Sequence, residues 1–218
     1  MNQQLWSAVD DYFSGRLIPP DPALEAAVAA SADAGLPSIS VAANQGKLLN
    51  LLARMSGARR ILEIGTLGGY STIWLARALP AGGHLLTIEA DERHAEVARA
   101  NLDRAGLVDL VEVRLGKALE VLPGIAGPFG LTFIDADKEN NAEYFRAALE
   151  RSEPGGVIVV DNVVRAGRIV QEGARDPGVE GVHRLHELIA AEPRVDATAL
   201  QTVGGKGYDG LTIALVTG

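Results

Sequence analysis

Two apolar runs of this sequence end abruptly in residues that could bind a metal ion. Residues 130–134 lead directly into Asp135, and residues 156–160 lead into Asp161 and Asn162. Each run has the length and composition of a buried strand, and ligands of open α/β sheets bind at the carboxyl ends of the strands. If the two strands are neighbours, three oxygen donors converge there. This donor set suits a hard cation such as Mg²⁺, Ca²⁺ or Mn²⁺.

Two further charged residues, Asp137 and Lys138, follow Asp135 closely. Lys138 could take up a proton if it were neutral, and a nearby cation together with partial burial lowers the pKa of an amine. The alternative is an ion pair between Lys138 and one of the two aspartates. Either aspartate could also cap the following helix. We favour a metal site, because two strand ends carry acidic residues and a cap explains only one. No role follows for Asp137.

A glycine-rich stretch, residues 65–69, joins another expected strand to a helix. Glycines there let the backbone approach a ligand closely, and the free amides at the start of a helix attract an anion. Glu89 ends the next strand, where an acidic side chain can bond both hydroxyls of a ribose. The stretch is not G-x-G-x-x-G, which disfavours a dinucleotide. The alternatives are a tight turn and a solvated carboxylate.

Strands and helices alternate from residue 60 onward, which is typical of a parallel, doubly wound sheet. Two consecutive strands, 195–203 and 211–216, close the chain without a helix between them, so we expect an antiparallel hairpin with its joint at 204–210. The expected strands before them are 60–64, 84–88, 110–115, 131–134 and 157–160, and the expected helices are 71–79, 92–105, 118–122, 140–151 and 182–191. The fold class is therefore α/β, a seven-stranded, mostly parallel sheet with helices on both faces.

The first 57 residues are expected to form three helices, over 3–14, 22–34 and 43–55, attached to an α/β core over 58–218 in one domain. Residues 163–178 are expected to form a long polar loop, whose arginines could meet an acidic substrate or be solvated. The aromatic residues of the first helix could close over a substrate or dock that helix, and two later histidines are expected on a surface face. These residues are Arg165, Arg168, Arg175, Trp6, Tyr12, Phe13, His183 and His186.

Composition excludes several functional classes. The chain has 218 residues, a formal charge of −8 and no cysteine. Acidity argues against binding nucleic acid or an anionic membrane, and the missing thiols exclude disulfides and zinc–thiolate sites. No apolar run is long enough to span a bilayer, and the amino end lacks a signal-peptide pattern. We therefore expect a cytoplasmic protein.

Four motifs in order, E-I-G-T-x-G-G-Y-S, T-I-E, F-I-D-A-D-K and V-V-D-N, together with the terminal K-G-Y-D-G-x-T-x-A-L, resemble the cation-dependent O-methyltransferases that use S-adenosylmethionine. That family includes caffeoyl-CoA and catechol O-methyltransferases. The resemblance implies a Rossmann-like class I methyltransferase fold and, by analogy, a homodimer. It implies cofactor contacts from Val41, Glu63, Gly65, Thr66, Ser71, Glu89, Ala118 and Asp135, metal ligation by Asp135, Asp161 and Asn162, and catalysis by Lys138 and Asp135, with Lys138 as general base.

The resemblance implies methyl transfer from S-adenosylmethionine to a catechol-like, vicinal dihydroxy phenol. A divalent cation lowers the pKa of a phenol, and a vicinal diol can chelate it in a fixed geometry. Plant members carry Trp and Asn where this chain has Arg165 and Ala166, which argues against a caffeoyl-CoA substrate. The alternatives are a non-catechol small acceptor, an RNA or protein acceptor, a nicotinamide-dependent oxidoreductase and a non-catalytic binding module.

Overall fold

The computed structural model describes residues 2–171 and 176–218, and its centre is one seven-stranded sheet. The strand order is β3-β2-β1-β4-β5-β7-β6. The first five strands in this order run parallel, and β7 is antiparallel to both β5 and β6. This confirms the expected class I methyltransferase topology. The strands are β1 Arg60–Ile64, β2 His84–Glu89, β3 Val111–Leu115, β4 Phe129–Ile134, β5 Ser152–Asp161, β6 Val195–Gly204 and β7 Gly207–Val216.

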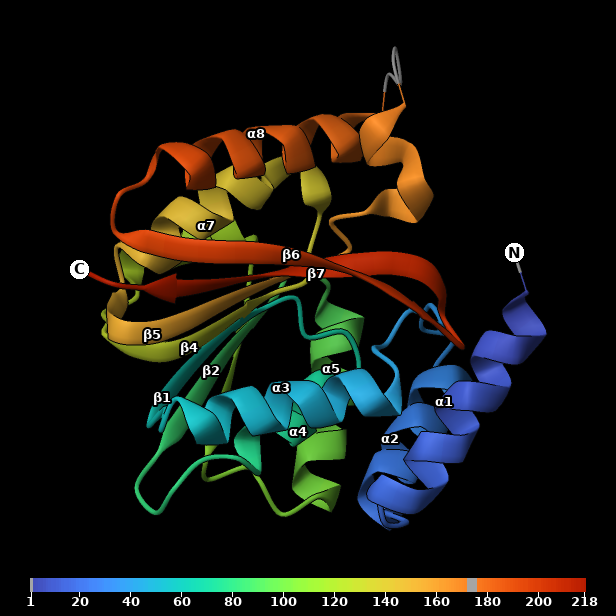
Figure 1. Ribbon diagram of the computed structural model, residues 1–218. Coiled ribbons are helices and arrows are strands. Elements are labelled where there is room, and N and C mark those ends of the chain that lie inside the picture. The colour runs from blue at the N-terminus through green and yellow to red at the C-terminus, as the bar shows by residue number, and fades with distance from the viewer. Residues whose placement is uncertain (1, 172–175) are drawn as a thin grey trace.

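Helices cover both faces of the sheet, as Figure 1 shows: α7 and α8 lie above it, and α3, α4 and α5 lie below it. The helices are α1 Gln3–Leu17, α2 Pro22–Asp33, α3 Ala43–Met55, α4 Tyr70–Ala76, α5 Glu92–Arg104, α6 Ala118–Val121, α7 Asn141–Leu149 and α8 Pro177–Ala191, with short 3₁₀ turns at Leu122–Gly124, Lys138–Asn140 and Arg165–Val170. Coverage on both faces explains why β4 is buried along its whole length: a parallel strand between two helical layers has no solvated side.

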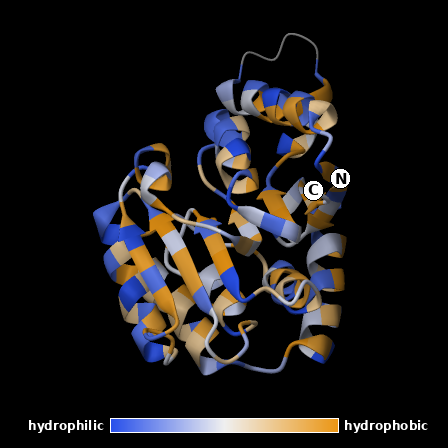
Figure 2. Cartoon of the chain, turned by 90° about the vertical axis from the view of Figure 1, so that its left-hand side faces the viewer, coloured by the Kyte–Doolittle hydropathy of each residue, from blue (hydrophilic) through white to orange (hydrophobic). Residues whose placement is uncertain are grey.

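The hydrophobic core is divided by the sheet into two clusters. One contains Phe145 of α7 and Leu185 of α8, and the other contains Leu49 of α3 and Ile73 of α4. Figure 2 shows the strands as largely hydrophobic bands between helices of mixed hydropathy. Burial of apolar area at about 25 cal/mol per Å² is the main force that holds such layers together. A rigid sheet therefore fixes the strand ends, which carry the chemistry.

Several sequence-based boundaries were wrong. Helix α8 begins at Pro177 rather than 182, because Asp176 caps it by accepting hydrogen bonds from the amides of Gly178 and Val179. Strand β5 begins at Ser152, through a proline and two glycines that suggested a turn. The final hairpin turns within residues 205–206, so most of the expected joint belongs to β7.

The expected loop over 163–178 was also partly wrong. It contains the 3₁₀ turn Arg165–Val170 and the first residues of α8. Arg175 lies outside the residues that the structure describes. The single-domain organisation stays a prediction.

The first helix differs from the rest in its packing. None of its residues is buried, and Leu5, Val9, Tyr12, Phe13 and Leu17 are all exposed. Polar contacts hold it to the final hairpin instead: Asp10 accepts a hydrogen bond from the Gly205 amide at 2.7 Å, and Gln3 donates to the Gly204 carbonyl at 2.8 Å. Tyr12 and Phe13 therefore do not dock α1, whereas Trp6 is half-buried. Among the described helices, none is long and apolar enough to cross a membrane.

Candidate active site

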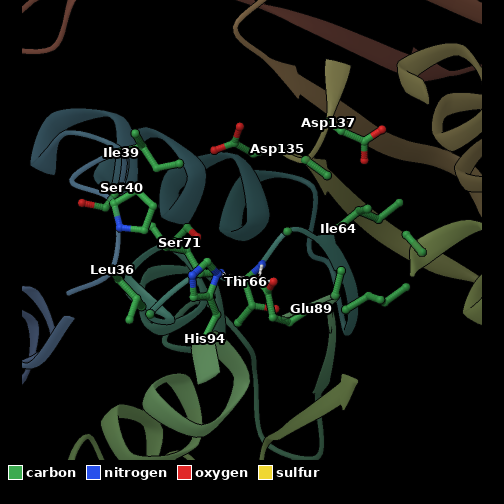
Figure 3. A pocket seen from close by; sticks show the side chains of 18 of the residues that line it. Leu36, Ile39, Ser40, Ile64, Thr66, Ser71, Glu89, His94, Asp135 and Asp137 are labelled. Carbon is green, nitrogen blue, oxygen red and sulfur yellow. Dashed lines mark hydrogen bonds and ion pairs between the residues drawn. The ribbon is translucent and has the colours of Figure 1, made fainter. Parts of the chain in front are cut away.

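A cavity of about 980 Å³ opens at the carboxyl edge of the parallel strands. Figure 3 shows Thr66, Ser71, Glu89 and His94 on one side of it and Asp135 and Asp137 on another. The cavity is lined by most of the predicted site residues, namely Val41, Gly65, Thr66, Ser71, Glu89, Ala118, Asp135, Lys138 and Asn162. Glu63 and Asp161 are buried behind its wall. Residues predicted from distant motifs therefore do converge.

The glycine-rich turn brings two strand ends into direct contact. Gly65 has a φ of +100°, and a Cβ atom placed on it would lie 2.1 Å from the backbone oxygen of Asp135. Only glycine accepts that conformation and that approach. The turn thus connects the end of β1 to the end of β4, and the backbone at Gly65 forms part of the cavity wall.

Glu89 holds the glycine-rich turn in place. Its Oε2 accepts hydrogen bonds from the amides of Thr66 and Leu67, at 3.1 and 2.7 Å. Its Oε1 accepts one from the Asp91 amide at 3.0 Å, and His94 lies 3.6 Å from the same oxygen. A carboxylate offers about four lone-pair sites, so Glu89 retains acceptor capacity toward the cavity while it organises the turn.

Glu63 is fully buried one layer below the cavity. It accepts hydrogen bonds from three hydroxyls, those of Ser71, Thr72 and Thr87, at 2.7, 2.5 and 2.7 Å. Burial raises the pKa of Glu63 to about 7, the charge of Asp135 adds to the rise, and the three hydroxyls oppose it. Since Ser71 lines the cavity, Glu63 acts on that wall through Ser71.

The acidic strand ends meet as the sequence predicted. Strands β4 and β5 are neighbours, with Ile134 opposite Val160, so Asp135 and Asp161 follow at the same level. Lys138 donates a hydrogen bond to Oδ1 of Asp135 at 2.7 Å, and its side chain is only 10% exposed. Asn162 lines the cavity with a φ of +57°, a left-handed conformation that asparagine tolerates. The ion pair considered for Lys138 is therefore present.

Asp161 is a buried carboxylate whose charge is poorly compensated. Burial raises its pKa to about 7, and the nearby charge of Asp135 contributes, while Lys138 and hydrogen bonds from the Asn162 amide and Gln45 oppose the rise. Gln45 Nε2 donates to Asp161 Oδ2 at 2.6 Å, and the Asn162 amide donates to Oδ1 at 2.7 Å. A divalent cation would supply the missing positive charge.

The donor set fits a hard cation. Asp135 and Asp161 supply carboxylate oxygens and Asn162 supplies an amide oxygen, which are the ligand types that Mg²⁺ and Ca²⁺ prefer. Within residues 2–171 and 176–218 no group of three His, Cys, Asp or Glu side chains could hold a metal. A site here accordingly depends on two carboxylates and one amide, with the remaining positions open to other oxygen ligands.

Two residues of the site were missed from the sequence. Gln45 lies in α3, far from any motif, and no local signal marks it. Asp137 lines the cavity and accepts hydrogen bonds from the Tyr144 hydroxyl, at 2.5 Å, and from Asn140. Burial raises the pKa of Tyr144, and its bond to Asp137 adds to the rise. Its position as the second acid of the F-I-D-A-D-K motif was the sequence signal that could have identified Asp137 as a site residue.

Other candidates do not contribute to the cavity. Trp6, Tyr12 and Phe13 are not among the residues that line it. His183 hydrogen-bonds the Ile169 carbonyl at 2.8 Å, and His186 bonds the Val182 carbonyl and the Thr212 hydroxyl, each at 2.9 Å. These histidines tie α8 to its neighbours, which agrees with the non-metal interpretation.

The fold and the site together define a methyltransferase of class I topology, and comparisons with known proteins give the family. A family model described as O-methyltransferase matches residues 20–216. The chain is 51% identical over 220 residues to a catechol O-methyltransferase of Niastella koreensis, covering 99% of this chain and 100% of that protein. It is 54% identical over 209 residues to a catechol O-methyltransferase of Mycobacterium tuberculosis, covering 95% and 94%.

A solved structure gives the same result. The O-methyltransferase of Bacillus cereus, in complex with S-adenosylhomocysteine (SAH), superposes with a TM-score of 0.97 at 55% identity, covering 99% of this chain and 100% of that one. This chain belongs to the O-methyltransferase family. The resemblance found in the motifs is confirmed, and the oxidoreductase alternative is excluded.

Proposed function

We propose that this protein transfers a methyl group from S-adenosylmethionine to one hydroxyl of a catechol-like phenol and that the transfer depends on a divalent cation. One observation supports this best: Asp135, Asp161, Asn162 and Lys138 meet at the cavity that also contains the glycine-rich turn. The names of the two catechol O-methyltransferases support the acceptor class.

In this proposal Asp135, Asp161 and Asn162 hold the cation, which when bound supplies the Lewis acidity that lowers the pKa of a phenol. Gln45 and the Asn162 amide orient the Asp161 carboxylate. The Asp161 carboxylate is thereby fixed before the acceptor arrives, and such preorganisation lowers the cost of reaching the reactive geometry.

Lys138 is proposed as the general base. Its Nζ lies against Asp135 Oδ1 at 2.7 Å in a largely enclosed position. An amine accepts a proton only when neutral, and a bound cation would oppose the lysine charge and compete for Asp135. The phenol proton would then pass to Nζ and leave a phenolate oxygen. That oxygen would attack the methyl carbon while its bond to the sulfonium sulfur breaks and S-adenosylhomocysteine leaves.

The sulfonium cofactor, which supplies the methyl group, is proposed to occupy the other end of the cavity. Glu89 would accept hydrogen bonds from the ribose and Ala118 would lie beside the adenine. Val41, Gly65, Thr66 and Ser71 would contact the methionine part, with Glu63 supporting Ser71 from behind. All of these residues except Glu63 line the same cavity, which supports this arrangement.

Chelation tests the cation requirement. The protein is assayed with S-adenosylmethionine and catechol, first with Mg²⁺ and then with excess EDTA, while calorimetry follows SAH binding in both conditions. We expect turnover to disappear in EDTA and return with added Mg²⁺, with SAH bound throughout. Full turnover in EDTA would refute the cation-dependent mechanism. Bound SAH with no turnover of any diol would point to a non-catechol acceptor.

We also propose a homodimer that covers the exposed apolar face of α1, formed by Leu5, Val9, Tyr12, Phe13 and Leu17. These residues recur every three to four positions and so share one side of the helix. Light scattering should give twice the chain mass for the wild type and a shift toward monomer for Phe13→Glu. A wild-type protein with the mass of one chain by light scattering would exclude the dimer.

A further inference from the structure

Arg165 lies on the cavity wall in an unusual backbone segment directly after the proposed metal ligands. Arg165 and Ala166 both have a φ of +56°, and Gly167 follows at +83°. Non-glycine residues in this region cost free energy that the surrounding structure must offset. Asp209 does so here, because its Oδ1 accepts hydrogen bonds from the amides of Val164 and Arg165, at 3.0 and 2.9 Å. Asp209 of the terminal K-G-Y-D-G motif thus fixes the backbone of the turn that carries Arg165.

The guanidinium of Arg165 lacks the partners that its neighbour has. Arg168 forms an ion pair with Asp176 and also donates to the Arg165 carbonyl at 3.2 Å. Arg165 forms no ion pair with any residue in the described ranges, and its buried Nε has no hydrogen-bond partner there. The pKa of Asp176 is lowered mainly by hydrogen bonds from the amides of Val179 and Gly178. The charge of Arg168 lowers it further, and the charge of Arg165 makes a smaller contribution.

The other cationic side chains that line the cavity are each beside an acid. Lys138 lies 2.7 Å from Asp135, and His94 lies 3.6 Å from Glu89. Lys117 lies 4.0 Å from Glu120. Among the cavity-lining cations in the described part of the chain, Arg165 is the one with a buried nitrogen that has no hydrogen-bond partner. Arg165, Lys138 and Asn162 all line the cavity, and Arg165 Nη2 lies near Gly178, as does Cβ of Lys138.

We propose that Arg165 binds a carboxylate on the acceptor, so that the preferred substrates are vicinal dihydroxy aromatic carboxylates rather than neutral catechols. This inference rests on the proposed function, since it assumes an acceptor held by its diol near Asp161 and Asn162. A planar guanidinium can form two parallel hydrogen bonds to a carboxylate, which fixes orientation as well as adding affinity. Arg165 is a specificity residue in this proposal and takes no part in proton transfer.

The test compares three acceptors that share a diol: protocatechuate, its uncharged methyl ester, and catechol. Wild-type kcat/KM should be about 10- to 100-fold higher for the acid than for the ester, the range expected for a charge-assisted hydrogen bond. In Arg165→Gln this acid-to-ester ratio should fall toward one, mainly through KM, and Arg165→Lys should restore part of it. Arg54→Gln, which removes an exposed arginine of α3 that does not line the cavity, should keep the wild-type ratio.

Calorimetry of protocatechuate binding to the SAH-loaded protein provides a readout independent of turnover. Equal kcat/KM for acid and ester in the wild type would overturn the assignment without any variant, as would an unchanged ratio in a folded Arg165→Gln. If no diol is methylated while SAH binds normally, the proposed function itself fails. Catechol turnover without acid preference removes only the role of Arg165.

Discussion

The carboxylates at the two ends of the cavity have different surroundings. At the ends of β1 and β2, Glu63 and Glu89 are each surrounded by three hydrogen-bond donors, which are hydroxyls or backbone amides. At the ends of β4 and β5, Asp135 and Asp161 lie close enough for the charge of one to raise the pKa of the other. The first pair is bonded to neutral donors, whereas the second pair has, within the described residues, only the charge of Lys138 beside two carboxylates.

This difference indicates a structural role for Glu63 and Glu89 and a catalytic role for Asp135 and Asp161. A carboxylate whose lone pairs are filled by the protein orders a turn, whereas two adjacent carboxylates cost stability until a cation compensates them. Changes at the β4–β5 end should therefore harm activity while sparing or increasing stability. Changes at the β1–β2 end should instead affect stability and cofactor affinity.

Asp161→Asn should have the largest effect. We expect kcat to fall about 1,000-fold, because one charged metal ligand is lost. Without metal at pH 8, the free energy of unfolding should rise by about 1 kcal/mol or more, since a buried charge disfavoured by its surroundings is removed. Initial rates and urea unfolding measure the two effects. Asp196→Asn, at an exposed position of β6, is the matched control and should change neither. An Asp161→Asn protein with lower stability would contradict the conclusion that the β4–β5 carboxylates destabilise the metal-free protein.

Lys138→Gln should have the next largest effect, lowering kcat about 100-fold if the lysine takes the phenol proton. A base role also predicts that the pH dependence of kcat differs between the variant and the wild type. Lys117→Gln, whose side chain in the wild type is 79% exposed, serves as the control. A variant that raises KM but keeps the wild-type pH profile would reduce Lys138 to an ion-pair partner of Asp135.

Glu63→Gln tests the β1–β2 end of the cavity through the pH dependence of the free energy of unfolding. The folded-state pKa of Glu63 is about 7 and its ordinary value is 4.5, so the folded state holds an extra proton between these values. The free energy of unfolding should therefore fall as pH rises through this window, and Glu63 accounts for about 2 kcal/mol of that fall. Urea unfolding at pH 5 and pH 8 should give a flatter dependence for the glutamine variant. An identical slope would show that Glu63 is ionised throughout.

The same contrast explains what could be predicted from the sequence. Short, continuous apolar runs precede Asp135 and Asp161, and their length and flanking glycines favour buried strands. The fold class and the convergence of the two acids could therefore be predicted. Gln45 and Asp209 were not assigned roles because the residues that they contact in the site are distant from them in the sequence. The start of α8 was missed because Gly178 and Gly181 resemble loop residues; Gly181 is needed where the helix packs on the Lys138 carbonyl.

Asp209→Ala should give the smallest effect. It tests whether the β4–β5 end of the cavity can be changed without affecting the β1–β2 end. Asp209 Oδ1 accepts hydrogen bonds from the amides of Val164, Arg165 and Gly210, so its loss releases the left-handed turn beside Asn162. We expect kcat/KM for the acceptor to fall about 10-fold with SAH affinity unchanged, because the turn lies away from the glycine-rich loop. Asp209→Asn keeps an acceptor oxygen and should retain most activity. Equal losses for acceptor and SAH would mean that the two ends of the cavity are not independent.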